Sequence, residues 1–429
     1  MQKHTRSFSR FQAALIIIFL ILIFTGCSSG GGESSPEDGY NPDPGTPTPD
    51  VTSRPSSEWT FMVYMCSDNS LEFYDYLDIL EMQDVGSTDS VNIIVQWDRK
   101  GLDQTLDWEG CRRYYVTKTD YVGGNTGVHS DMLEELGDVN MGDPQALVEF
   151  IQWGKLNFPA NKYAVILWNH GNGWRSGQDG SSKGICYDDT SNDYLTDAEL
   201  EWAFYETSGG NNNKIELIGM DACLMGQLEI AYSLRNYAKY MAFSQMSEPG
   251  EGWPYDSILR PLTENPTMNG ADLGTVVVDA YRDFYTSTSG LSMSAINLSA
   301  VGTLASKIDA FSQTALNNMN YYGYILRDCS DQAASLDDTY TDYKDISEYF
   351  SIVSANIGSE NLKIAADEVI RSLGDVVIKE YHDSTYNCSG LSIWLPDYSN
   401  YCNYYANYQL LSFAYDTWWD EFIGEMQNY

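Results

Sequence analysis

Basic residues are scarce in this sequence, and their scarcity argues against a whole class of partners. Lysine and arginine number 24 among 429 residues, against 61 aspartates and glutamates, which gives a formal net charge of −37. A protein that binds DNA or RNA needs a basic face for the phosphates, so no nucleic acid is expected as a partner. The acidic surplus is typical of a soluble exported protein, and it attracts basic ligands.

Histidines and paired cysteine motifs are also few. None of the eight cysteines lies in a CxxC motif, so neither a zinc ribbon nor a thioredoxin-type site is expected. The histidines are His4, His129, His170 and His382, which leaves few candidates for a base that works near neutral pH. Seven cysteines follow Cys27, an odd number, so at least one thiol stays unpaired within the chain.

The N-terminus carries the pattern of an export signal. Basic residues precede the apolar run 13–24, and Thr25-Gly26 stand directly before Cys27. These features are typical of a secretory signal, and the cysteine resembles that of the bacterial lipobox, which becomes the lipidated first residue. An uncleaved membrane anchor is the alternative, but about 12 apolar residues are few for a span of ~20. We therefore expect a lipoprotein of the cell envelope, at the outer membrane or the cell surface, held to the bacterial membrane by a lipid anchor on Cys27.

Four segments are expected along the chain. A signal peptide occupies 1–26, and a tether rich in Gly, Ser and Pro occupies 27–57, which has too few apolar residues to form a core. A folded core follows over 58–265. A helix-rich C-terminal region over 266–429 is expected to add strands to the same sheet.

Nearly continuous apolar strands define the fold class. They are predicted at 60–65, 91–97, 163–168 and 215–220, and amphipathic helices stand between them. Strands buried on both faces and alternating with helices indicate an α/β fold, with a mainly parallel sheet covered by helices on both faces. The remaining expectations are a hairpin over 105–118, a helix at 144–156, a polar loop from 175 to 193, a helix with a capping box from 196 to 207, and a helix over 225–236.

Two reactive side chains each follow a strand of this sheet. His170 follows the strand at 163–168, and Cys223 follows the strand at 215–220. Active groups of parallel sheets lie beyond the carboxyl ends of the strands, so we expect His170 and Cys223 to form a pair. Taken alone, each residue is more simply a structural histidine or an inert buried thiol.

A histidine beside a cysteine supplies nucleophilic catalysis. The imidazole takes the proton of the thiol, and the thiolate attacks a carbonyl carbon. Cys223 is expected just before a helix, whose N–H groups favour an anion. Gly171 leaves room for a close backbone approach and is expected to donate a second N–H to an oxyanion. This pair needs no metal and no organic cofactor.

The order and spacing of these residues carry a family resemblance. His170 precedes Cys223 by 53 residues, which is similar to caspase-like peptidases. The segments Asn169-His170-Gly171, 221–225 and 247–253 together resemble the clostripain family, peptidase family C11, and 388–396 resembles the family's C-terminal part. The resemblance implies a caspase-like fold and a cysteine endopeptidase with His170 and Cys223 as its catalytic residues.

Substrate preference is also implied by the resemblance. The family cleaves after Arg or Lys, so proteins or peptides with these residues are the expected substrates. Asp221 matches the acidic residue at the base of the family's specificity pocket. For the second acidic residue, Glu251 is preferred over Glu248, and a Glu where the family has Asp makes the pocket shorter. The alternative is a catalytically inactive caspase-like lipoprotein that binds protein or glycan.

Two further properties follow from the resemblance. Family members are activated by a cut after a basic residue between the histidine and the cysteine. Arg175 and Lys183 are the two basic residues of the loop there, and the bond Lys183-Gly184 is preferred because polar residues surround it. Some family members depend on calcium, and the stretch 188–193 is a weak candidate for Ca2+, since it lacks the Gly and terminal Glu of an EF-hand loop. A solvated loop is the alternative for that stretch.

Overall fold

A computed structural model describes residues 56–102, 105–119, 127–175, 184–209 and 214–429 of the chain. These described residues belong to one compact unit. The strands are β1 (Ser57–Ser67), β2 (Val91–Arg99), β3 (Gly110–Tyr115), β4 (Asp131–Gly137), β5 (Ala160–Trp168), β6 (Ile185–Asp188), β7 (Asp193–Leu195), β8 (Ile215–Asp221), β9 (Ala238–Phe243), β10 (Ser292–Asn297), β11 (Tyr343–Asp345), β12 (Val377–His382) and β13 (Ser392–Trp394).

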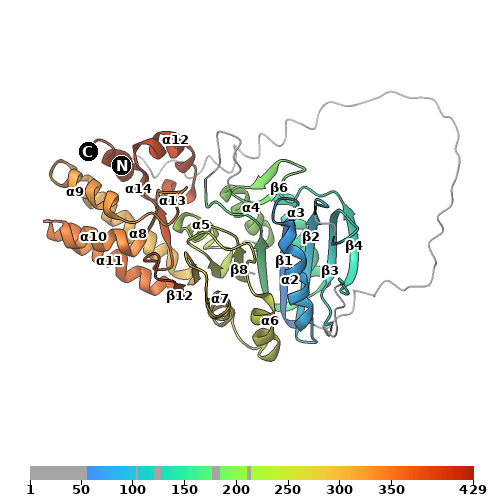
Figure 1. The fold of residues 1–429 in the computed structure, drawn as a ribbon. Helices are drawn as coiled ribbons and strands as arrows, with labels where there is room; N and C mark the ends of the chain where they lie inside the picture. Colours follow the sequence, from blue (N-terminus) through green and yellow to red (C-terminus); the bar gives the residue numbers. More distant parts are fainter. Residues whose placement is uncertain (1–55, 103–104, 120–126, 176–183, 210–213) are drawn as a thin grey trace, which may run out of the picture. The chain divides into compact units, whose positions relative to one another are not determined.

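The helices alternate with these strands in the first half of the chain and dominate the second half (Figure 1). They are α2 (Glu72–Val85), α3 (Pro144–Asn157), α4 (Asp197–Thr207), α5 (Leu228–Leu234), α6 (Tyr255–Glu264), α7 (Gly270–Phe284), α8 (Leu298–Leu316), α9 (Met319–Gln332), α10 (Ile346–Asn356), α11 (Glu360–Val376), α12 (Tyr398–Tyr408), α13 (Ser412–Asp416) and α14 (Trp419–Met426). Among the described residues, no helix is both long and apolar enough to cross a membrane.

A nine-stranded sheet organises the fold, in the order β12-β10-β9-β8-β5-β1-β2-β3-β4. The five central strands, β9, β8, β5, β1 and β2, are parallel. Antiparallel strands complete both edges, with β3 and β4 at one and β10 and β12 at the other. The mainly parallel α/β fold predicted from the sequence is therefore confirmed, and strands from beyond residue 265 extend the same sheet.

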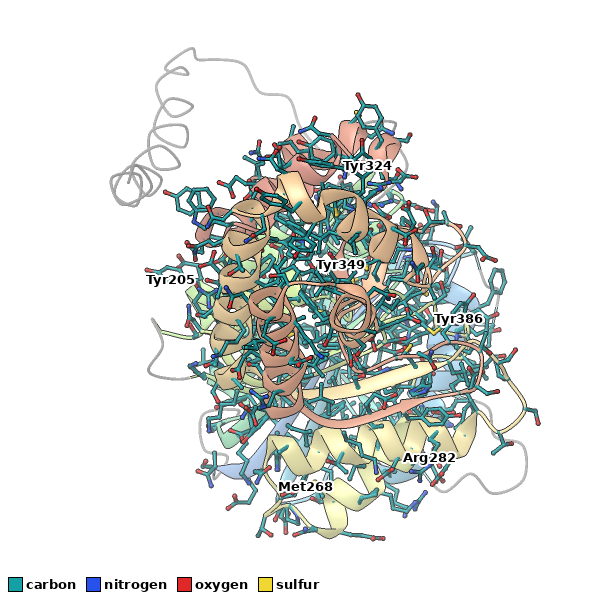
Figure 2. All side chains as sticks on the ribbon, turned by 90° about the vertical axis from the view of Figure 1, so that its left-hand side faces the viewer. Tyr205, Met268, Arg282, Tyr324, Tyr349 and Tyr386 are labelled. Atoms are coloured by element: carbon teal, nitrogen blue, oxygen red, sulfur yellow. The ribbon has the colours of Figure 1, made fainter. Side chains whose placement is uncertain are left out.

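Both faces of the sheet are covered by helices, because successive strand residues point to opposite sides. Along β1, Met62 and Tyr64 belong to a core cluster that also contains residues of α3, α4, α5 and α8, whereas Phe61 and Val63 belong to a second cluster with residues of α2, α6 and α7. Each face thus has its own apolar core, and the central strands are buried along nearly their whole length. Figure 2 shows α7, which carries Arg282, beside the strands of the sheet edge.

Several boundaries differ from the sequence predictions. The hairpin predicted over 105–118 is wrong, because β3 is a single strand that pairs with β4, at 131–137. Exposed residues dominate β4, so it lacks the apolar pattern by which a strand is recognised. The polar loop predicted up to 193 contains the short antiparallel pair β6 and β7. The capping box at Thr196 is confirmed, with the Glu199 N–H 3.3 Å from the Thr196 hydroxyl.

A buried arginine ties the ends of β1 and β2 to the start of α2. The Arg99 guanidinium lies 2.8 Å from a Glu72 carboxylate oxygen and 3.4 Å from Asp75, and all three side chains have no exposed surface. It also donates to the Trp108 carbonyl at 2.9 Å. Trp97 and Ser67 donate to Asp75, each at 2.7 Å. Removing only the cation would therefore leave two buried carboxylates without compensation.

We predict that Arg99→Met lowers the free energy of unfolding by about 3–5 kcal/mol, as is usual when one partner of a buried ion pair is removed. The control is Arg282→Met, because Arg282 pairs with Asp279 and Asp283 at the surface, where solvent screens the charges, so its loss is expected to change the free energy of unfolding much less. Urea titrations in a Cys223→Ala background measure both variants. Equal losses for the two arginines would show that the buried network does not stabilise the fold as argued.

Candidate active site

The register of two neighbouring strands brings His170 and Cys223 together. Strand β5 pairs in parallel with β8, and Trp168 is aligned with Asp221. His170 lies two residues beyond Trp168, and Cys223 lies two residues beyond Asp221, so the two side chains leave the same edge of the sheet. Both line one pocket of about 290 Å³. Its other lining residues are Leu71, Tyr74, Trp168, Asn169, Asp221, Ala222, Glu248, Pro249, Gly250 and Gly252.

Polar contacts hold the loop that carries His170. The Asn169 side chain donates to the carbonyls of Cys66 and Tyr187, the latter at 3.1 Å, and accepts the Tyr187 N–H at 2.8 Å. The Ser70 hydroxyl lies 2.9 Å from Nε2 of His170. Burial lowers the pKa of His170, although the nearby Asp189 opposes this effect. The imidazole is therefore neutral at pH 7 and can accept a proton.

The thiol of Cys223 is also neutral in this site. Burial raises its pKa to about 11, although the Glu248 N–H, which lies 3.1 Å from Sγ, favours the thiolate. A neutral thiol beside a neutral imidazole indicates proton transfer during the attack on the substrate, rather than an ion pair formed beforehand.

A strained turn, and not a helix N-terminus, presents Cys223. The helix predicted from residue 225 starts at Leu228, so no helix dipole acts at the sulfur, and that part of the sequence argument is wrong. Leu224 has φ = 64°, a left-handed conformation that is rare for a bulky residue. Its N–H donates to the Met246 carbonyl at 2.9 Å, and the Gly226 N–H donates to the Ser244 carbonyl at 2.7 Å. The segment after β9 therefore holds the cysteine turn.

Gly171 is required by the close approach of two chain segments. A Cβ atom at this position would lie 2.4 Å from the Cys223 carbonyl oxygen. Any side chain would therefore push the histidine loop away from the cysteine turn. The close backbone approach predicted for Gly171 is therefore present, and the segment that approaches it is the turn that carries Cys223.

Two buried carboxylates lie beside the cysteine. Asp221 accepts the Tyr255 hydroxyl at 2.9 Å and the Trp253 N–H at 3.3 Å, and burial raises its pKa to about 7. Both carboxylate oxygens of Glu248 are buried, although the residue as a whole is partly exposed, and burial together with Asp221 raises its pKa well above the usual range. Neither Glu248 oxygen has a hydrogen-bond partner of regular geometry among the described residues. The pocket therefore offers acidic groups that a cation can neutralise.

The remaining candidates from the sequence lie elsewhere. Glu251 is exposed and does not line the pocket, so the structure places Glu248, the less favoured of the two, beside Asp221. Cys27 and Lys183 lie outside the described residues. In the stretch 188–193, Asp188 and Asp193 are cross-strand partners of the β6–β7 pair, and Asp193 accepts an N–H of Asn140 at 2.7 Å. Calcium binding by this stretch stays a prediction.

Sequence reasoning missed the supporting residues of the site. Ser70, Asp78 and Tyr255 come from three separate segments that the sequence does not link. Ser70 follows the end of β1, so the strand-end argument applied to His170 also pointed to this segment. Asp78 accepts the indole N–H of Trp168 at 2.6 Å from within α2, a contact that depends on how that helix packs.

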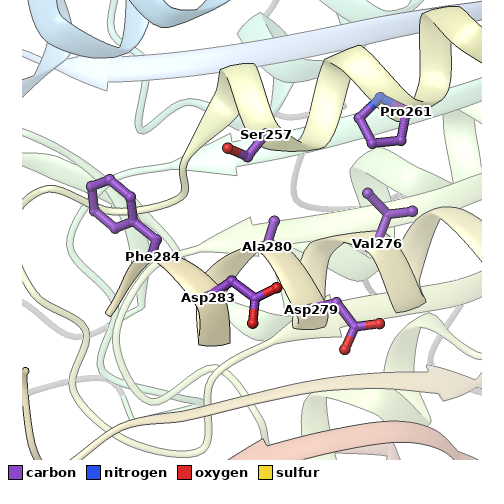
Figure 3. Close-up of a pocket in the computed structure, with 7 residues that line it drawn as sticks. All are labelled: Ser257, Pro261, Val276, Asp279, Ala280, Asp283 and Phe284. Carbon is purple, nitrogen blue, oxygen red and sulfur yellow. The ribbon is translucent and has the colours of Figure 1, made fainter. Parts of the chain in front are cut away.

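A second pocket, of about 440 Å³, lies between α6 and α7 (Figure 3). Its carboxylates, Asp279 and Asp283, already pair with Arg282. Its other lining residues, Ser257, Pro261, Val276, Ala280 and Phe284, include no thiol or imidazole. This pocket therefore holds no histidine–cysteine pair.

A mainly parallel sheet with histidine and cysteine after adjacent central strands defines the class of caspase-like cysteine peptidases. The sequence profile of the clostripain family matches residues 63–425. Clostripain of Hathewaya histolytica is 26% identical in an alignment 425 positions long, which covers 84% of this chain and 79% of that protein. The chain belongs to the clostripain family, peptidase family C11, and is a cysteine endopeptidase.

Solved structures agree in fold. An inactive zymogen C11 protease from Parabacteroides distasonis superposes with a TM-score of 0.64 at 19% identity, over 85% of this chain and 99% of that chain. A secreted C11 cysteine protease from Bacteroides thetaiotaomicron, in complex with an irreversible peptide inhibitor, gives a TM-score of 0.60 at 19% identity, over 87% of this chain and 100% of that chain. The expected caspase-like architecture is therefore confirmed.

We predict that alkylation of Cys223 by iodoacetamide accelerates about tenfold per pH unit between about pH 7 and pH 9, because the thiolate fraction grows at that rate well below the thiol pKa. The experiment uses Cys402→Ser, which removes the exposed thiol; the other five cysteines in the described part of the chain are buried. Peptide mass spectrometry measures the labelled fraction over time. A rate that levels off near neutral pH would indicate a preformed thiolate–imidazolium pair instead.

Proposed function

We propose that this chain is a lipid-anchored endopeptidase that cleaves after Arg or Lys, with Asp221 and Glu248 as the acidic partners of the substrate side chain. The observation that supports this specificity is the pair of buried carboxylates beside Cys223, one of which has no regular hydrogen-bond partner. A guanidinium can bind two carboxylate oxygens at once, and an ammonium meets them as a point charge. Glu248 therefore replaces Glu251 as the second acidic group.

The order of events follows from the contacts of the pair. Ser70 engages Nε2 of His170, so Nδ1 is the nitrogen left to accept the thiol proton. The sulfur attacks the carbonyl carbon of the basic residue itself, and the oxyanion is held by the N–H groups of Gly171 and Cys223. His170 then gives the proton to the leaving amine, and water hydrolyses the thioester. No observation on the described residues favours the alternative of an inactive binding protein.

Activation by a cut after Lys183 belongs to the same proposal. Arg175, the other basic residue of that loop, is 3% exposed and pairs with Asp342. Its guanidinium lies 4.5 Å from the ring centre of Tyr404 and 5.0 Å from that of Tyr343. Because Arg175 is buried and paired, a peptidase would have no access to the bond that follows it. The bond after Lys183 is therefore the one we propose is cut.

We predict that Asp221→Asn and Glu248→Gln each lower kcat/KM for Arg-ended fluorogenic peptides about 30- to 5,000-fold, the effect of about 2–5 kcal/mol that follows when one partner of a buried charge pair is lost. The matched control is Glu251→Gln, which changes an exposed carboxylate and is expected to leave kcat/KM within about twofold. Thermal melts and labelling of Cys223 show that each variant is folded. Full activity of Asp221→Asn on basic substrates, or preference for another residue type in the parent protein, would contradict the proposed specificity.

We further predict that mass spectrometry of the protein from bacterial membranes finds an acylated Cys27 as first residue and a chain break after Lys183. The variant Cys27→Ser is expected to leave the membrane fraction, because its lipid anchor is missing. The variant Lys183→Ala is expected to remain a single chain, and the inactive Cys223→Ala shows whether the cut is made by the enzyme itself. An intact chain in the parent protein with full activity would contradict processing as the activating step.

A further inference from the structure

The loop between α9 and β11, residues 333–342, lies in the C-terminal half of the chain and reaches the catalytic cysteine. Its Leu336 forms a small buried cluster with Met246 and Cys388. The Met246 carbonyl accepts the Leu224 N–H at 2.9 Å, a bond that holds the cysteine turn. The loop is therefore docked on the same segment, after β9, that supports the nucleophile.

Two hydrogen bonds in series connect this loop to the sulfur of Cys223. The Ser247 hydroxyl donates to one carboxylate oxygen of Asp337 at 2.9 Å, and the Ser247 side chain is also a hydrogen-bond partner of the Cys223 thiol. The second oxygen of Asp337 accepts the Thr339 N–H at 2.7 Å and the Tyr340 N–H at 3.0 Å. The loop itself thus holds the carboxylate with its first oxygen toward Ser247.

The chemistry of Asp337 sets the direction of these two bonds. An aspartate carboxylate is ionised at neutral pH and can only accept hydrogen bonds. A serine hydroxyl has one hydrogen, and Asp337 takes it. The Glu248 carbonyl, 3.7 Å from the sulfur, is a further acceptor for the thiol hydrogen. Ser247 therefore offers the sulfur an oxygen lone pair, which accepts that hydrogen but does not stabilise a thiolate.

We propose that Asp337 is a positioning residue of the active site, which acts through Ser247 to keep the proton on Cys223 while no substrate is bound. The thiolate is the form that oxidants and alkylating agents attack, so a neutral thiol is protected between turnovers. When substrate binds, the same proton passes to His170 as the sulfur attacks the carbonyl carbon, and no further reactant is needed. The C-terminal region thereby contributes to the chemistry of the site as well as to the sheet.

Other titratable groups also face the sulfur. They are His170 after β5, Asp221 at the end of β8, Glu248 after β9, Tyr281 of α7 and Tyr340 of the loop. Burial lowers the pKa of the histidine and raises the pKa of Glu248 and of both tyrosines, so these four groups are neutral at pH 7. Asp221 has a pKa of about 7 and accepts hydrogen bonds from Tyr255 and Trp253. Asp337 differs from all of them, because a single hydroxyl joins its carboxylate to the sulfur.

Alkylation of Cys223 by iodoacetamide in the full-length Cys402→Ser protein, in detergent, tests the proposal through the variant Asp337→Asn. The amide oxygen takes the place that accepts the two backbone N–H groups of the loop, so the amide NH2 faces Ser247 and donates to its oxygen. The hydroxyl hydrogen is then released to the sulfur, where it stabilises the thiolate. We expect alkylation at about pH 7.5 to accelerate about three- to tenfold, and the pH profile of the rate to move down by about 0.5–1 pH unit.

Two controls separate this chain of hydrogen bonds from a general effect of charge. Asp338→Asn removes the neighbouring, exposed carboxylate of the same loop and is expected to leave the alkylation rate within about twofold. In a Ser247→Ala background the bridge is absent, so the addition of Asp337→Asn is expected to change the rate by less than about twofold. Thermal melts show that every variant is folded.

Equal acceleration by Asp337→Asn and Asp338→Asn would overturn the proposal, because the loss of one negative charge would then account for the effect. An unchanged rate in Asp337→Asn, or an undiminished effect in the Ser247→Ala background, would overturn it as well. So would a parent rate that levels off near neutral pH, because the thiol would then not be held neutral. The reagent is not a peptide, so the outcome is independent of the proposed preference for Arg or Lys.

Discussion

The parallel pairing of β5 with β8 is the constraint on which the active site depends. Hydrogen bonds fix the register so that Trp168 is aligned with Asp221, and both reactive side chains then follow at the same distance along their strands. A slip by one residue would turn one of them to the opposite face of the sheet. Both strands are buried along their paired length, which makes their register strongly specified. The catalytic pair is therefore positioned by two strands of the buried core.

Features that depend on local pattern could be predicted from the sequence. The central strands are apolar throughout, and the capping groups of Thr196 and Asp143 mark helix starts by side-chain chemistry alone. The strand β4 and the helix α12 could not be found in this way, because their burial does not follow a simple period. In α12, Tyr408 is the one buried residue, so its aromatic content does not reveal which face packs.

The same distinction applies to the site. His170 and Cys223 follow strand ends and could be found by that rule. The choice between Glu248 and Glu251 depended on how the loop after β9 turns, which the sequence does not show. The two residues are only three positions apart, yet the carboxylate of Glu248 is buried and Glu251 is exposed. The structure also corrects the predicted surroundings of the Cys223 sulfur. The sulfur was expected at a helix N-terminus, but it lies in a strained turn and is 3.1 Å from the Glu248 N–H.

Glu248 contacts both parts of the site at once. Its backbone N–H lies 3.1 Å from the sulfur of Cys223, and its carboxylate lies at the buried wall of the pocket beside Asp221. One residue therefore contributes both to the acidic wall of the pocket and to the polar surroundings of the nucleophile, so a substitution that shifts its backbone would alter both.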